Sequence, residues 1–74
     1  MRKELKIFRY QKFLTQQELA DITGVSVSTY NLIENGKRRG SEDFWLRLKN
    51  KFNLTGADVW ELQNGKLEFK EKEH

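Results

Sequence analysis

Apolar residues recur three or four positions apart along most of this 74-residue chain, with polar residues between them. This is the spacing of one helix face, so the pattern predicts a series of short amphipathic helices. Leu5 and Phe8 lie one turn apart and predict a first helix over residues 2–12. Ile7 and Tyr10 fall on another side of that helix. We expect them to form a floor beneath the next helix, although a second packing surface is the alternative.

A capping box predicts where the second helix begins. In TQQE, residues 15–18, the Thr15 hydroxyl can accept from the backbone N–H of Glu18, and the Glu18 carboxylate can accept from that of Thr15. The helix ends at Gly24, because glycine tolerates the left-handed backbone of a tight helix exit. Its inward-facing residues are expected to be Leu19, Ala20 and Ile22.

A third helix is expected to follow almost at once. Ser26 can cap its start, and Asn35-Gly36 can end it. At 100° per residue, Tyr30 and Ile33 share the side that faces the core. The opposite, exposed side carries Val27, Ser28, Asn31, Leu32 and Asn35.

Two further helices complete the pattern. Ser41 is followed by two acidic residues, which is typical of a helix start, and Asn53 can end that helix. The apolar stripe between them is Phe44, Trp45, Leu48 and Phe52. TGAD, residues 55–58, predicts the cap of a short last helix that carries Val59, Trp60 and Leu62.

The predicted fold class is therefore all-α, a compact bundle of about five short helices in one domain over residues 1–64. Beyond Asn64 the apolar period changes to two, since Leu67 and Phe69 alternate with charged residues. Such alternation is typical of a strand. A flexible tail explains it equally well, so residues 65–74 are expected to be one or the other.

The composition excludes several kinds of protein. The chain has no Cys, and its one His is the last residue, so we expect no disulfide, metal site or cofactor. Ser26, Ser28 and Ser41 have no internal His as a base, and we expect neither enzyme activity nor a small-molecule substrate. No stretch approaches the roughly 20 apolar residues of a membrane span. The first ten residues lack a signal-peptide core, which favours a cytoplasmic protein.

The positive charge is concentrated at one place. A net charge of +3 is by itself only a mild preference for a polyanionic partner. Lys37, Arg38 and Arg39, however, are consecutive and come directly after the third predicted helix. Basic side chains at this position are suited to hold the phosphates of a nucleic acid.

Residues 16–36, QQELADITGVSVSTYNLIENG, have the form of a helix-turn-helix. Two helices joined at Gly24 must cross steeply to bury both apolar sides, and the small Ala20 lets the second approach closely. With LTQQELADITGVSVSTYNLIENGK and the closing segment NLTGADVWEL, the chain resembles the Cro and phage-repressor (XRE-type) helix-turn-helix family from about Leu5 to Leu62. It departs from the family at three positions. Phe13 stands where a Gly is common, Gly40 where a Pro is common, and Lys49 where a small apolar residue is common.

The resemblance implies a small regulator that binds double-stranded operator DNA in a phage or bacterial genetic switch. The residues expected to face the bases are Val27, Ser28, Asn31 and Leu32. Those expected to hold phosphates are Gln16, Gln17, Ser26, Asn35, Lys37, Arg38 and Arg39. Operators read by such domains are usually paired half-sites, so a homodimer on DNA is expected, with Val59, Trp60 and the Leu67/Phe69 segment as candidate surfaces.

The resemblance also implies a buried ion pair between Arg9 on the first helix and Glu34 at the end of the third. Both residues stand where the family has this pair. Removing either partner of such a pair would leave the other charge buried and uncompensated.

A second function stays open for the third helix. It carries no Arg, Lys or Gln, the side chains that read base edges most often. Temperate phages encode small antirepressors that bind the lysogeny repressor and mask its DNA-reading surface, and the chain resembles them in size. The face for such a partner, an apolar strip on the third helix, would comprise Val27, Tyr30, Asn31 and Leu32.

Overall fold

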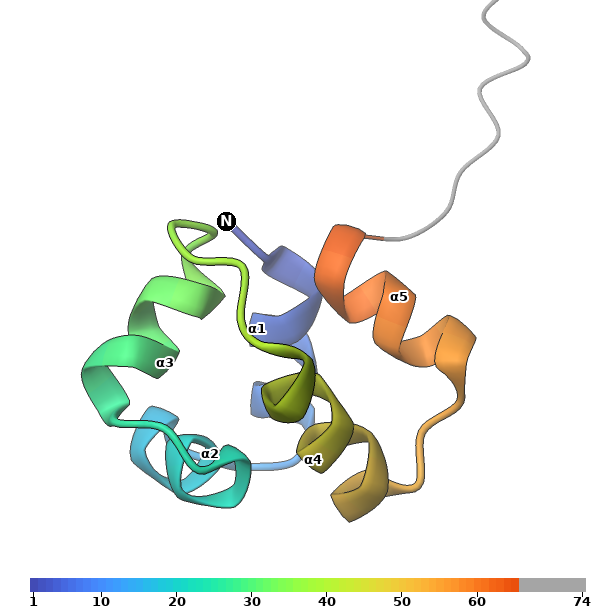
Figure 1. Ribbon diagram of the computed structural model, residues 1–74, viewed down its shortest axis with the longest axis horizontal. Helices are drawn as coiled ribbons and strands as arrows, with labels where there is room; N and C mark the ends of the chain where they lie inside the picture. Colours follow the sequence, from blue (N-terminus) through green and yellow to red (C-terminus); the bar gives the residue numbers. More distant parts are fainter. Residues whose placement is uncertain (66–74) are drawn as a thin grey trace, which may run out of the picture.

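The computed structural model describes residues 1–65, which form five helices joined by short connections (Figure 1). The helices are α1 (Lys3–Gln11), α2 (Gln16–Thr23), α3 (Val27–Glu34), α4 (Glu42–Phe52) and α5 (Gly56–Asn64). These residues contain no strand, so the predicted all-α fold class is confirmed. The predicted strand or tail with Leu67 and Phe69 lies outside the described residues. None of the helices in residues 1–65 combines the length and apolar character needed to cross a membrane.

The predicted helix starts carry the expected caps. The Thr15 hydroxyl accepts from the backbone N–H of Glu18 at 3.1 Å, and the Glu18 carboxylate accepts from that of Thr15 at 2.8 Å. Ser26 and Ser41 cap α3 and α4 through one hydrogen bond each. A second capping box, between Thr55 and Asp58, opens α5. Each cap satisfies backbone donors that helix geometry leaves without a partner, which is why these starts could be recognised in the sequence.

All five helices contribute to one core. α4 lies at its centre, where it contacts α2 on one side and α5 on the other (Figure 1). The Phe44 ring lies 6.1 Å from that of Tyr30 and 4.8 Å from that of Trp45, centroid to centroid. Burying a large apolar side chain contributes about 1.5–3 kcal/mol, so these residues hold α3 and α4 together. The buried apolar residues are Leu5, Leu19, Ala20, Tyr30, Ile33, Phe44, Trp45, Leu48 and Leu62.

The expectation that Ile7 and Tyr10 form the floor of the core was wrong, because both side chains are exposed. α1 packs on α3 and α5 through the side that carries Leu5 and Arg9, which turns Ile7 and Tyr10 outward. The Tyr10 ring covers charged groups instead, with its centroid 4.7 Å from the Arg9 guanidinium carbon.

Left-handed backbone at three glycines, Gly24, Gly36 and Gly40, shapes the connections around α3. Gly24 has φ +78° and ends α2 as predicted. Gly40 has φ +83°, and a Cβ placed there would lie 2.8 Å from Nε1 of Trp45. Proline fixes φ near −65°, so this conformation excludes the Pro that the related family commonly has at the position.

Phe13, directly after α1, also has left-handed backbone, with φ +58°. This conformation costs a residue with a Cβ about 1–2 kcal/mol. The Phe13 side chain is 92% exposed and gains little packing in return. The position is therefore strained in a way that the glycine common in the related family would avoid.

We expect Phe13→Gly to raise the free energy of unfolding by about 0.5–1 kcal/mol, because relief of the strain exceeds the greater freedom of glycine in the unfolded chain. Urea denaturation measures this change. Phe13→Ala is the matched control, since it removes the same ring but keeps the Cβ, and should change stability by less than about 0.5 kcal/mol. Equal effects of the two substitutions would contradict the strain explanation.

Candidate nucleic-acid interface

α2 and α3 cross each other at a steep angle, and α3 lies at the edge of the molecule (Figure 1). The inner side of α3 is buried through Tyr30, Ile33 and Glu34. On its outer side Val27 is 36% and Leu32 37% exposed, so two large apolar side chains are in contact with water. The predicted base-facing residues and Gln16 come together around one shallow hollow of about 400 Å³, lined by Gln16, Val27, Ser28, Asn31 and Leu32.

Tyr30 does not belong to this outer side, and its placement on a partner-binding face was wrong. Its side chain is fully buried. The reason is the helical repeat, which puts Tyr30 on the same side as Ile33 and beneath the Phe44 ring. Its hydroxyl donates to Glu34 Oε2 at 2.8 Å. Burial, together with this hydrogen bond, raises the pKa of Tyr30 far above its ordinary value, so the phenol stays protonated.

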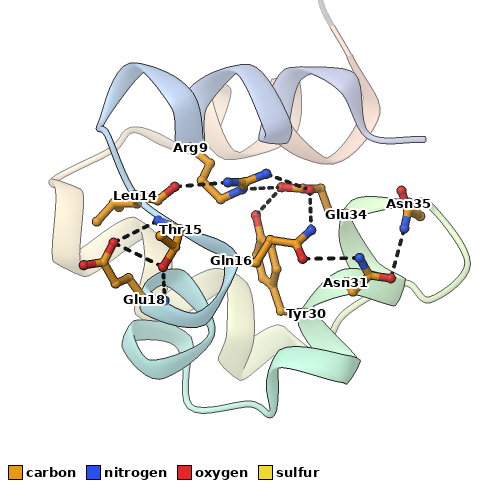
Figure 2. Close-up of polar contacts among 9 residues, drawn as sticks. All are labelled: Arg9, Leu14, Thr15, Gln16, Glu18, Tyr30, Asn31, Glu34 and Asn35. Atoms are coloured by element: carbon orange, nitrogen blue, oxygen red, sulfur yellow. Dashed lines mark hydrogen bonds and ion pairs between the residues drawn. The ribbon is translucent and has the colours of Figure 1, made fainter.

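An ion pair between Arg9 and Glu34 lies between α1 and α3 (Figure 2). Arg9 Nε donates to Glu34 Oε2 at 2.8 Å, and Arg9 Nη2 donates to Glu34 Oε1 at 3.2 Å. This two-point contact matches the planar guanidinium to the carboxylate. The remaining terminal nitrogen, Nη1, donates to the backbone carbonyl of Leu14 at 3.0 Å and so ties the connection between α1 and α2 into the same contact.

The Glu34 carboxylate accepts hydrogen bonds from side chains of three helices. Besides Arg9 from α1, it accepts from Tyr30 of α3 and from Gln16 Nε2 of α2, the latter at 2.8 Å. Burial by itself would raise the pKa of Glu34. Hydrogen bonds from Arg9, Gln16 and Tyr30, together with the positive charge of Arg9, outweigh burial and lower that pKa below its ordinary value. The carboxylate is therefore charged at neutral pH.

A chain of side-chain amides connects this buried carboxylate to the outer side of α3 (Figure 2). Asn31 Nδ2 donates to Gln16 Oε1 at 3.3 Å, and Asn35 Nδ2 donates to Asn31 Oδ1 at 3.1 Å. The orientation of Asn31 is thus set from both sides. Gln16 still has a second N–H that it could offer to a phosphate, so that role stays a prediction.

The other residues expected to hold phosphates lie around the same edge. Gln17 donates to Asp21 within α2, and the Ser26 hydroxyl is engaged in capping α3. The exposed residues Lys37, Arg38 and Arg39 follow α3 in the loop to α4. Their roles toward DNA are still predictions, but the basic loop directly continues the helix that carries the base-facing residues.

Arg2 was missed in the sequence and holds this basic loop in place. Its guanidinium nitrogens donate to the backbone carbonyls of Arg38 at 2.8 Å and Arg39 at 3.2 Å, and also to Ile33 at the end of α3. The Arg2 backbone N–H donates to the carbonyl of Glu34 at 2.8 Å. Burial lowers the pKa of Arg2 below its ordinary value, and the positive charge of Arg39 lowers it further. Nothing in the local sequence indicates a contact across more than thirty residues.

With this geometry established, comparison with known proteins identifies the family. A family model described as helix-turn-helix matches residues 5–59, which is most of the chain. The chain belongs to the helix-turn-helix family. It is a DNA-binding helix-turn-helix regulator, and this family is not typically enzymatic. Neither a curated protein nor a solved structure matches the chain.

Replacing Arg9 by Met should lower the free energy of unfolding by about 3–5 kcal/mol, because Glu34 would remain charged and buried without its main partner. Urea denaturation followed by circular dichroism measures the loss. Arg47→Met is the matched control, since Arg47 forms an ion pair with Asp43 at 2.8 Å on the exposed side of α4. Exposed pairs contribute about 0–1 kcal/mol. A loss for Arg9→Met as small as that of the control would show that the buried pair does not stabilise the fold.

Proposed function

We propose that this helix-turn-helix protein binds double-stranded operator DNA and acts as a small transcriptional regulator of a phage or bacterial genetic switch. The observation that carries the proposal is the exposed outer side of α3 beside the basic loop of Lys37, Arg38 and Arg39. An α-helix fits the major groove of DNA, and positive charges next to it meet the phosphates at the groove edge. Such a protein works where the DNA of the host cell lies, in the cytoplasm or nucleoid.

Phosphate contacts would fix the position of the domain on DNA. The first turn of α2 presents the side chains of Gln16 and Gln17 next to its positive helix end, which favours an anion. Asn35 and Ser26 lie at the two ends of α3, and the basic loop follows. Arg2 would act on DNA indirectly, because it holds the carbonyl groups of that loop and so positions the side chains of Arg38 and Arg39.

Base recognition would depend on short side chains. Asn31 can pair with adenine, and the Asn35 and Gln16 amides already orient it for a defined approach. Val27 or Leu32 can contact a thymine methyl group, and Ser28 can donate or accept with little discrimination. The outer side of α3 offers no bidentate arginine–guanine contact, each worth about 1–3 kcal/mol, so selectivity between operators is modest. Paired half-sites would be read by two copies of the chain.

Arg38→Ala should weaken binding to duplex DNA and reduce the slope of log affinity against log salt by about 0.9, the amount expected for one lost phosphate contact. Fluorescence anisotropy over a salt series, with a duplex taken from DNA next to the gene, measures the slope. Lys51→Ala is the matched control, because Lys51 is an exposed cation near the end of α4. If the wild type shows no binding at low salt, the operator-binding role is rejected.

A second candidate function uses the same outer side of α3 for a protein. The hollow between Val27 and Leu32 is largely apolar, and the outer side of α3 carries no cation. An exposed apolar strip on an outward helix often marks a protein interface. The alternative is therefore an antirepressor that binds the lysogeny repressor encoded beside it and blocks the DNA binding of that repressor.

For an antirepressor, co-expression with that repressor should yield a complex that elutes as one species at micromolar concentration. Val27→Asp or Leu32→Asp should weaken it at least tenfold, because each puts a charge into an apolar contact. Ile7→Asp is the matched control, since Ile7 is about equally exposed but lies on α1. Separate elution of the wild-type protein and the repressor would reject this alternative.

A further inference from the structure

A pocket of about 560 Å³ lies outside the helix-turn-helix, where the segment before α1, the loop from α3 to α4 and the end of α5 meet. These three segments lie along the same edge of the molecule (Figure 1). Sites for small molecules usually have volumes of about 300–1,000 Å³. Two of the lining side chains are arginines, Arg2 and Arg39, and one is acidic, Glu42. The pocket therefore has a net positive lining.

The two arginines bring positive charge together without an anionic partner. Within residues 1–65 neither Arg2 nor Arg39 forms an ion pair. The terminal nitrogens of Arg2 donate to backbone carbonyls, but its buried Nε has no hydrogen-bond partner among these residues. Arg39 lowers the pKa of Arg2, because the two like charges repel each other. An anion beside both guanidinium groups would offset this repulsion.

The lining groups favour phosphate among the possible anions. A guanidinium group offers a planar set of donors that matches phosphate oxygens, and two such groups match its double charge. The amide of Gln63, near the end of α5, lines the same pocket and supplies neutral N–H donors. Glu42 opposes an anion, but it is one negative charge against two positive ones.

We propose that this pocket binds the phosphate group of a small molecule, with Arg2, Arg39 and Gln63 as its ligands. A small molecule fits better than the DNA backbone, because Gln63 belongs to α5, which lies at the edge of the molecule opposite α3 (Figure 1). Arg39 cannot hold this ligand and a DNA phosphate at once, so the small molecule would lower the affinity for DNA. Only this regulatory consequence rests on the proposed function, since the phosphate site itself needs no DNA.

Trp45 reports on the site. Its indole N–H donates to the Arg39 carbonyl at 3.1 Å, and the Arg2 guanidinium carbon lies 5.6 Å from its ring centroid. The chain has two tryptophans, so Trp60→Phe leaves Trp45 as the only one. Inorganic phosphate, added to this full-length variant at constant ionic strength, should change the fluorescence saturably, with half-saturation on the order of a millimolar. Sodium chloride in place of phosphate should produce no saturable change.

Two substitutions in the Trp60→Phe protein should change the affinity for phosphate in opposite directions. Arg39→Gln should weaken binding at least about fivefold, because it removes one of the two guanidinium groups. Glu42→Gln should strengthen binding about twofold to threefold, because it removes the opposing charge. Lys51→Gln is the matched control, since it removes the charge of an exposed cation near the end of α4 that does not line the pocket. A stronger affinity in Glu42→Gln could not come from damage to the fold.

A linear change of fluorescence with phosphate would overturn the proposal, and so would equal affinities of Arg39→Gln and Lys51→Gln. Fluorescence anisotropy with duplex DNA then distinguishes the two sources of phosphate. Gln63→Leu should weaken phosphate binding at least about fivefold and leave the affinity for DNA within about twofold. If it weakens both, the pocket holds a phosphate of the DNA backbone, and the small-molecule proposal is rejected. Saturable phosphate binding without any DNA binding would reject the proposed function alone.

Discussion

The Arg9–Glu34 ion pair is the contact on which the arrangement of the first three helices depends. A carboxylate removed from water is unfavourable unless its charge and lone pairs are matched. Here the matching groups come from α1, α2 and α3, so the charge is satisfied only when all three helices are in place. Apolar packing alone tolerates small shifts between helices, whereas this set of directional bonds does not. The pair therefore fixes where α3 lies, rather than merely adding to stability.

The same contacts that bury the inner side of α3 also determine which of its residues are exposed. Because Tyr30 and Glu34 hold one side of α3 against α1 and α2, the side with Val27 and Leu32 is turned outward. Gln16 connects the two sides, since its amide bonds Glu34 inside and Asn31 outside. Arg2 extends the same principle to the basic loop, whose carbonyl groups it holds. A ligand on α3 thus meets a surface that is largely ordered before binding, which lowers the entropic cost of association.

Features with a local cause could be predicted from the sequence. Thr15, Ser26 and Gly24 act through bonds or backbone angles within a few residues, so the local sequence is enough to predict their roles. Helical periodicity likewise indicated which residues of α3 face outward, and it placed Tyr30 correctly on the inner side; only its assignment to a partner-binding face was wrong. The predictions that were wrong or missing concern residues whose contacts come from distant parts of the chain. Ile7 and Tyr10 are exposed because of how α1 meets other helices, and Arg2 contacts a loop far along the chain, which no local pattern specifies.

Titration of Glu34 by carboxyl ¹³C NMR tests whether its hydrogen-bond partners stabilise the charged carboxylate against the cost of burial. The pKa should lie below the ordinary value of 4.5, because hydrogen bonds and the Arg9 charge outweigh burial. A group whose pKa is lower in the folded than in the unfolded state stabilises the fold at every pH above its unfolded-state pKa. That stabilisation is lost as the pH falls through the folded-state pKa. The free energy of unfolding should therefore decline below about pH 4.5 as the carboxylate takes up its proton. A Glu34 pKa at or above 4.5 in the folded protein would show that these partners do not outweigh the cost of burying the charge.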